Sequence, residues 1–295
     1  MIKITKMNKL WILPVLLILS LSASCQNDND VLPEVIEKDY QLADIDLSHW
    51  KVTLPIPRED GKALEVYPPE ILNYANMDVL KPFMYNDSVN GAIVFYTYPG
   101  STTQNTSYSR TELRELMDTE NNDVNWKFAD GAFMKGKLQL ARISKDEDGD
   151  YHKTIVMQIH GRLSKEQQEL IGASSTDAPP ILKIYWNDGK IRVKTKKIKN
   201  LGSSAEEILK KSAWIDDEGH TFDTYVGFDP FTLSVEVSDG LMVIRLNDDE
   251  EVRYSDIHMK KWGVFENYFK AGNYLGTKDS NGFAVVKYYT LEVNH

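Results

Sequence analysis

Cysteine and positive charge are the scarce features of this sequence. Cys25 is the single cysteine among 295 residues, which excludes an intrachain disulfide and a zinc site built from several cysteines. Lysine and arginine number 34 against 44 aspartate and glutamate residues, for a formal net charge of -10. An acidic chain is a poor binder of nucleic acid, so we expect no nucleic-acid partner. A local basic cluster can still bind a polyanion, so the positions of the basic residues matter.

The first 24 residues have the pattern of an export signal. Three lysines precede a mainly apolar run from Leu10 to Leu21, which is too short to span a bilayer comfortably. Small residues and then Cys25 follow, as in a bacterial lipoprotein cleavage site, although Ser22 stands where such sites usually have leucine. We predict a lipoprotein-type signal peptide at 1–24, with lipid on Cys25. An ordinary secretory leader is the alternative.

The remaining chain divides into a predicted flexible tether at 25–44 and a folded domain at 45–295. The tether is polar and acidic, and its start, from Asn27 to Asp30, resembles the sequence that sends lipoproteins to the cell surface in some Gram-negative bacteria. We expect an exported outer-membrane or cell-surface lipoprotein, bound to the membrane only through Cys25, or a secreted protein if Cys25 carries no lipid. With 42% hydrophobic residues, the domain can form one substantial core, and we expect a monomer.

Helix signals are few in the domain, and no repeat of fixed period is evident. Short helices are predicted only at 69–74 and 164–171. Turn pairs such as Asp239-Gly240 separate segments rich in Val, Ile, Tyr and Phe, many of which alternate polar with apolar residues. The pattern predicts an all-β sandwich or jelly roll. The expected strands are 92–98, 136–143, 154–160, 181–186, 190–196, 225–228, 233–237, 241–246, 264–270 and 283–293.

The segment from Tyr108 to Leu116 carries the first candidate site residues. Side chains alternate between the faces of a strand, so Arg110, Glu112 and Arg114 would share one face. Glu112 could then hold both guanidinium groups and leave their outer N–H donors for a carboxylate. A solvated salt-bridge ladder on an outer strand is the alternative, and a helix is also compatible with the sequence.

Two further segments bring polar side chains to strand faces. Gln158 and His160 share a face, where a histidine can act as a general base near neutral pH, although a lone histidine is more often structural. Tyr268 and Lys270 share a face, Tyr274 has the same parity, and the glycine between them permits an unusual backbone angle. The alternative for this third segment is an aromatic strand that packs in the core.

Together, these side chains suit one reaction, β-elimination from a uronate. The proton at carbon 5 is barely acidic while the neighbouring carboxylate is charged. An arginine and an amide can neutralise that carboxylate and stabilise the enolate-like anion. A histidine or tyrosine can take the proton, and a tyrosine can protonate the departing glycosidic oxygen.

The three segments resemble the motifs of polysaccharide lyase family 7, the alginate lyases. That family has Arg-Ser/Thr-Glu-Leu-Arg, Gln-Ile/Val-His and Tyr-Phe-Lys-Ala-Gly-x-Tyr segments, which stand here in the same order at 110–114, 158–160 and 268–274. Residues 49–55 resemble the family's first strand, and the resemblance spans 45–294. It implies a jelly roll of two antiparallel sheets with a substrate cleft, alginate as partner, and neither a catalytic metal nor a cofactor.

The resemblance also implies roles for the candidate residues. Arg110 and Gln158 would neutralise the carboxylate, His160 would be the base and Tyr274 the acid. The residues implied to bind or orient substrate are Glu112, Arg114, Tyr268 and Lys270. Members with isoleucine between the Gln and His tend to accept guluronate, so Ile159 suggests guluronate-containing blocks; cleavage within the chain or from its ends stays open.

Two other features and two rival functions complete the sequence-based hypotheses. A basic strand face, formed by Lys190, Arg192, Lys194 and Lys196, either extends the cleft or is simply solvated. The stretch 100–107 is either a mobile lid or a plain loop. A jelly-roll glycoside hydrolase would need two nearby carboxylates, and Glu112 between arginines is a poor acid. A non-catalytic, glycan-binding surface lipoprotein would need neither His160 nor Tyr274.

Overall fold

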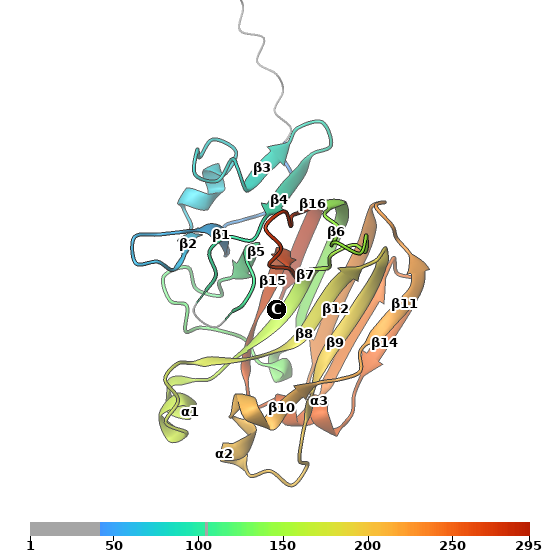
Figure 1. Cartoon of the computed structure of the whole chain (residues 1–295). Coiled ribbons are helices and arrows are strands. Elements are labelled where there is room, and N and C mark those ends of the chain that lie inside the picture. The colour runs from blue at the N-terminus through green and yellow to red at the C-terminus, as the bar shows by residue number, and fades with distance from the viewer. Residues whose placement is uncertain (1–41, 104–105) are drawn as a thin grey trace, which may run out of the picture. The chain divides into compact units, whose positions relative to one another are not determined.

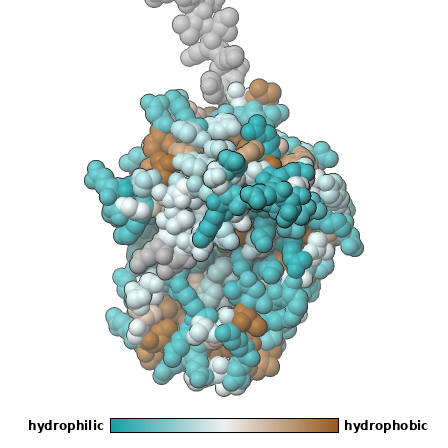
Figure 2. Space-filling view, viewed as in Figure 1, coloured by the Kyte–Doolittle hydropathy of each residue, from teal (hydrophilic) through white to brown (hydrophobic). Residues whose placement is uncertain are grey.

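The computed structural model describes residues 42–103 and 106–295. The predicted signal peptide, Cys25 and the tether up to residue 41 lie outside the described residues. Among the described residues, no helix is long and apolar enough to cross a membrane. Figure 2 shows that hydrophilic residues cover most of the visible surface, with smaller apolar areas between them.

Two antiparallel sheets form the body of the domain (Figure 1). The larger has nine strands in the order β10-β9-β8-β7-β15-β5-β1-β2, with β11 beside β9. Its strands are β1 (Trp50–Pro57), β2 (Ala63–Val66), β5 (Arg110–Glu115), β7 (Thr154–Arg162), β8 (Asp177–Asn187), β9 (Lys190–Ile198), β10 (Trp214–Asp216), β11 (His220–Tyr225) and β15 (Glu266–Leu275).

The smaller sheet has seven strands in the order β14-β13-β12-β6-β16-β4-β3. Its strands are β3 (Met84–Asp87), β4 (Ala92–Thr97), β6 (Ala132–Ile143), β12 (Phe231–Ser238), β13 (Leu241–Leu246), β14 (Glu250–Tyr254) and β16 (Ala284–Asn294). The helices are short: α1 (Lys165–Leu170), α2 (Ala205–Ile208), α3 (Ile257–Trp262), and the 3-10 turns η1 (Glu70–Asn73), η2 (Phe128–Asp130) and η3 (Lys211–Ala213).

The core lies between the two sheets, because each strand of the large sheet turns its apolar residues toward the small one. Cross-strand register aligns a fully buried row through the large sheet: Val52, Leu113, Ala271, Met157, Ile184 and Val193. Buried Leu, Val, Ile and Phe side chains of the small sheet pack against this row. The two sheets are also joined by a hydrogen bond from the Tyr288 hydroxyl to the Val156 carbonyl, at 2.5 Å. Since side chains alternate, the polar residues between these positions face outward.

Most of the predicted elements are confirmed, and one strand is wrong. Of the segment 225–228, only Tyr225 is in a strand, as the last residue of β11, and residues 226–228 form a turn in which the amides of Val226 and Gly227 both donate to the Gly189 carbonyl. The predicted helices are η1 and α1, and α1 begins with a capping box in which the Ser164 hydroxyl accepts from the Gln167 amide at 3.2 Å. The ambiguous segment at 110–115 is strand β5 rather than a helix.

Candidate active site

The outward face of the large sheet carries a cross-strand row of cationic and amide side chains. Antiparallel register puts paired residues on one face of a sheet, one beside the other. Here it runs unbroken across six strands, β1, β5, β15, β7, β8 and β9. The row consists of Lys51, Arg114, Lys270, Gln158, Lys183 and Lys194.

Alternation along β15 puts Tyr274 on the same face as Lys270. The pairing of β15 with β7 shifts between Ala271 and Tyr274, and Gly272 has a φ of 140°, a backbone conformation that other residues rarely adopt. The pairing of β15 with β5 has no such shift, and in it Tyr274 pairs with Arg110. The acid and the arginine of the predicted site are therefore neighbours.

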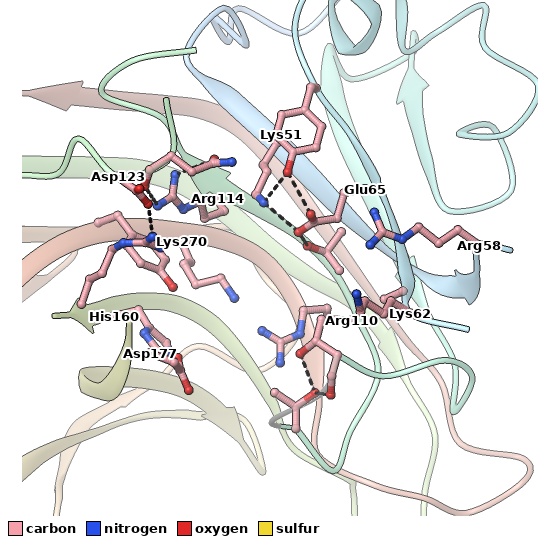
Figure 3. Close-up of a pocket in the computed structure, with 18 residues that line it drawn as sticks. Lys51, Arg58, Lys62, Glu65, Arg110, Arg114, Asp123, His160, Asp177 and Lys270 are labelled. Atoms are coloured by element: carbon pink, nitrogen blue, oxygen red, sulfur yellow. Dashed lines mark hydrogen bonds and ion pairs between the residues drawn. The ribbon is translucent and has the colours of Figure 1, made fainter. Parts of the chain in front are cut away.

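Two adjoining cavities of about 560 and 490 Å³ form a groove over this face. They share Thr106, Arg110, His160 and Asp177, so they are two parts of one groove. The first part extends over β1 and β2, and the second over β8 and β9. Figure 3 shows the basic side chains of the first part, together with His160 and Asp177, directed into the shared space. Arg110, Gln158, His160, Tyr268, Lys270 and Tyr274 all line this groove.

Glu112 lies beneath the groove as the hub of a buried ion network. It is 0% exposed, accepts from Arg110 Nη1 at 3.2 Å and from Gln158 Nε2 at 2.5 Å, and forms an ion pair with the Lys270 ammonium. Burial alone would raise the pKa of Glu112, but the charges of Lys270 and Arg110 hold it below its ordinary value. Glu112 can orient groove residues, but it cannot itself contact substrate.

The prediction that Glu112 holds both arginines is wrong for Arg114. Register places Lys270 beside Arg114 on the next strand, and it is Lys270 that reaches Glu112. Arg114 instead donates to the side chains of Asn122 and Asn125 at 3.3 and 3.0 Å, and its guanidinium lies 4.2 Å over the Tyr268 ring. The loop after β5 therefore fixes this guanidinium.

His160 is positioned as a neutral imidazole with one nitrogen toward the groove. Its Nδ1 donates to the Gly161 carbonyl at 2.9 Å, so Nε2 is the acceptor nitrogen. The ring stacks on Tyr268 at 5.3 Å and 12°. Burial lowers the pKa of His160 to about 4; Asp177 opposes this shift, whereas Lys270 and Arg110 add to it. The ring can therefore accept a proton at neutral pH.

Arg110 and Tyr274 form a stacked pair with a free donor edge. The Arg110 guanidinium lies 3.9 Å over the Tyr274 ring, and its Nη1 is held by Glu112. Its Nε and Nη2 are buried and find no hydrogen-bond partner among the described residues. Nε and Nη2 form one edge of the guanidinium. In arginine–carboxylate pairs, such an edge donates two parallel hydrogen bonds to the two carboxylate oxygens. Burial raises the pKa of Tyr274, so its hydroxyl keeps its proton at neutral pH.

Sequence reasoning missed the groove wall built by β1 and β2 and the carboxylate on β8. Lys51 donates to the Tyr67 hydroxyl at 2.8 Å and pairs with Glu65 at 2.9 Å, while Arg58 and Lys62 also line this part. Lys51 alternates with the apolar residues Trp50 and Val52, so the sequence could have predicted that Lys51 faces outward, on the groove side of the sheet. Asp177 was missed because two prolines follow it, and proline disfavours a central strand.

The remaining predictions about the groove have separate outcomes. Of the basic face on β9, Lys196 lines the second cavity, whereas Arg192 is held by the Thr221 hydroxyl at 3.0 Å and the Glu218 carbonyl. Thr103 and Thr106 line the first cavity, but residues 104 and 105 lie outside the described part, so the lid stays a prediction. In the described ranges, no three His, Cys, Asp or Glu side chains are grouped to hold a metal ion.

Comparison with known proteins identifies the family of this chain. A family model described as alginate lyase matches residues 45–295. Alginate lyase A1-II', a member of polysaccharide lyase family 7, is similar at 28% identity and a TM-score of 0.66, over 85% of this chain and 96% of that chain. Its variant with one histidine replaced by asparagine and one tyrosine by phenylalanine, in complex with substrate (GGMG), matches at 28% and 0.65, over 84% and 93%.

A more distant structure has the same fold. Alginate lyase PA1167 from Pseudomonas aeruginosa is 21% identical, with a TM-score of 0.62, over 85% of this chain and 99% of that chain. No match is found among curated proteins. The family model and the matching structures, together with the jelly roll and its basic groove, identify a polysaccharide lyase. Because the family model covers nearly all of the described chain, this protein belongs to the alginate lyase family.

Proposed function

We propose that this enzyme cleaves alginate by β-elimination at guluronate-containing linkages, with Arg110, His160 and Tyr274 in the central roles. The observation that carries the proposal is the donor edge of Arg110, whose Nε and Nη2 are buried without a partner among the described residues. Unpaired buried donors are costly, and a uronate carboxylate on this edge would satisfy both. Gln158 lies beside it in the groove, ready to assist with its amide.

The proton transfers follow from the two flanking side chains. Neutralising the carboxylate makes the carbon-5 proton removable, and the acceptor Nε2 of His160 takes it. The bond from carbon 4 to the glycosidic oxygen then breaks as the double bond between carbons 4 and 5 forms. Tyr274, whose hydroxyl is protonated, donates to the leaving oxygen. A histidine and a tyrosine are the residues replaced in the A1-II' variant described in complex with substrate, which supports this pair of roles.

Guluronate preference rests on two observations. Ile159 is the residue between Gln158 and His160, and its side chain is fully buried beneath the sheet, so it acts through the position of its neighbours. The substrate described for the A1-II' variant, GGMG, contains guluronate on both sides of one mannuronate. Histidine as base and tyrosine as acid suit anti elimination at guluronate.

Separated alginate blocks test the function. Purified enzyme should release unsaturated uronates, followed by their ultraviolet absorbance, fastest on guluronate-rich and mixed blocks. His160→Ala and Tyr274→Phe should each lower kcat by roughly 100-fold or more, the scale of a lost general acid or base, while alginate binding is retained. Near-full activity of either variant on guluronate-rich blocks would refute its assigned role. A product without the double bond would instead favour a hydrolase.

We also propose that the enzyme is an exported lipoprotein with lipid on Cys25. The positive start, the short apolar run and the small residues before Cys25 support this. Labelled fatty acid fed to expressing cells should enter the full-length protein and not a Cys25→Ala variant. Equal labelling of the two proteins, or of neither, would leave the secretory leader as the better interpretation.

A further inference from the structure

We infer that Asp177 is a positioning residue for His160: held by Lys211, its carboxylate stabilises the imidazolium that forms when His160 takes the substrate proton. The inference rests on the proposed role of His160 as base. It assigns a task to a carboxylate that lies, against expectation, in a groove built for a polyanion.

The geometry comes from the first residues of β8. Register shifts in the pairing of β7 with β8 fall on either side of His160, where the prolines at 179 and 180 interrupt the regular ladder. Asp177 precedes these prolines, and its Oδ1 lies 3.8 Å from His160 Nε2. Its other oxygen, Oδ2, accepts from the Lys211 ammonium of η3. Figure 3 shows Asp177 next to the His160 ring, at the edge of the groove.

The nitrogen that faces Asp177 is the one that receives the proton. Because Nδ1 of His160 already donates to the Gly161 carbonyl, a transferred proton must arrive at Nε2. The new N–H then lies beside Asp177 Oδ1, and closing the 3.8 Å separation by less than one ångström makes a charge-assisted hydrogen bond. The carbon-5–hydrogen bond of the substrate breaks as the N–H bond at Nε2 forms, and no other covalent bond of His160 or Asp177 changes.

Burial and two nearby cations oppose the protonation of His160. Arg110 from β5 and Lys270 from β15 are both cationic and act on the ring from the groove floor, and Tyr268 from β15 covers one face as a neutral ring. Asp177 supplies the opposing negative charge from β8. The Asp177 carboxylate repels an approaching uronate, which weakens substrate binding. Its stabilisation of the His160 imidazolium can offset this loss by speeding the proton transfer. Lys211 holds the carboxylate in place and weakens that repulsion.

Asp177→Asn tests the inference through binding, turnover and titration together. Losing one pKa unit of imidazolium stabilisation corresponds to about a tenfold slower proton transfer. We expect kcat to fall by about that factor while KM stays unchanged or falls, because one repulsive charge is gone. The His160 ring titration, followed by NMR, should move to lower pH, and the acidic limb of kcat/KM should move with it.

Asp216→Asn is the matched control. Like Asp177, Asp216 forms ion pairs with lysine side chains, here Lys183 and Lys196, but it has no contact with His160 among those described. The variant should leave kcat and the His160 titration unchanged. An Asp177→Asn enzyme with unchanged kcat and unchanged titration overturns the inference, as does an Asp216→Asn enzyme with the same two shifts.

Lys211→Gln provides a second variant in case Asp177→Asn does not fold. Without its ion pair to Lys211, the Asp177 carboxylate is no longer held beside His160, so the titration midpoint should move to lower pH, as in Asp177→Asn, and an unmoved or raised midpoint would contradict the inference. The titration also separates this inference from the proposed function. If His160→Ala retained full turnover, the base assignment would fail, whereas the shifts of the His160 titration would still report whether Asp177 acts on the ring.

Discussion

At the scale of single residues, the side chain that organises the site is one that substrate cannot touch. Glu112 fixes Arg110, Gln158 and Lys270 from below. Three groove residues thereby share one buried anion, which leaves the outer edge of Arg110 free for a substrate carboxylate. Glu112 also cannot serve a hydrolase as a general acid, because it is fully buried and its pKa is lowered.

Glu112→Gln should therefore destabilise the fold as well as the site. Removing the anion leaves Arg110 and Lys270 as buried cations without a counter-charge, which typically costs about 3–5 kcal/mol. Chemical denaturation should show this loss in the free energy of unfolding at neutral pH. Glu236→Gln, which removes an exposed ion pair with Arg245, should cost about 1 kcal/mol or less.

The pH dependence of this stability has a fixed sign. The folded-state pKa of Glu112 lies below its ordinary value, so ionised Glu112 stabilises the fold at any pH above that ordinary value. The contribution is lost as pH falls through the lowered pKa. The difference in unfolding free energy between wild type and Glu112→Gln should accordingly shrink on acidification. A constant difference would contradict the network described here.

Lys270 should set an alkaline limit on activity. Burial and the charge of Arg110 lower its pKa to about 8, so the ammonium loses its proton as pH rises through that value. A neutral Lys270 attracts a uronate less, and kcat/KM, which reports groups of the free enzyme, should fall there. Lys270→Arg keeps its charge at this pH, so its kcat/KM profile should lack the same limb even if its maximum is lower.

At the scale of strands, alternation was predictable and partner strands were not. The parity that puts Arg110, Gln158, His160 and Lys270 on one face is a local property of each strand, and the sequence motifs already contain it. The choice of Lys270 as the partner of Glu112 depends on β15 lying beside β5, which no local pattern encodes. The start of β8, which includes Asp177, was not predicted as a strand, because proline disfavours a central strand and two prolines stand at 179 and 180.

Gly272 is the strand position where a single methyl group should matter most. At a φ of 140°, an added Cβ would lie 2.7 Å from the Thr111 carbonyl oxygen and 2.9 Å from Glu112 Cα. Both contacts are with backbone of β5, so β15 and β5 must separate. Gly272→Ala should destabilise the protein by about 1–3 kcal/mol from backbone strain alone, with further loss from the clash, and should reduce turnover because Tyr274 moves.

Gly61→Ala is the matched control for this prediction. Gly61 also has a positive φ, of 78°, but an added Cβ meets nothing within 4 Å. Gly61→Ala should therefore lose stability through backbone strain but not through a steric clash. Its turnover on separated alginate blocks should stay near that of the wild type. Equal losses of stability and turnover in the two variants would mean that the close approach of β15 to β5 is not what holds Tyr274 in place.

At the scale of the whole molecule, an acidic protein carries a row of basic residues across one face of its large sheet. The formal net charge is -10, yet the cross-strand row that ends in Lys183 and Lys194 contains five cations and no carboxylate. Long-range fields are screened beyond about 10 Å at moderate salt, so a polyanion inside the groove is governed by the local charges. The bulk composition led us to expect no nucleic-acid partner but was silent on this local field.

Salt should therefore weaken alginate binding, and it should do so through the groove. KM on mixed blocks should rise with ionic strength, because each groove cation that contacts the polymer contributes to a screened attraction. Lys183→Gln removes one cation of the row and should raise KM at low salt and flatten its salt dependence. Lys135→Gln makes the same change in net charge on the opposite sheet, where Lys135 pairs with Asp248 at 3.0 Å. If the two variants responded to salt alike, the overall charge rather than the row would govern binding, and the groove would not be the polymer's path.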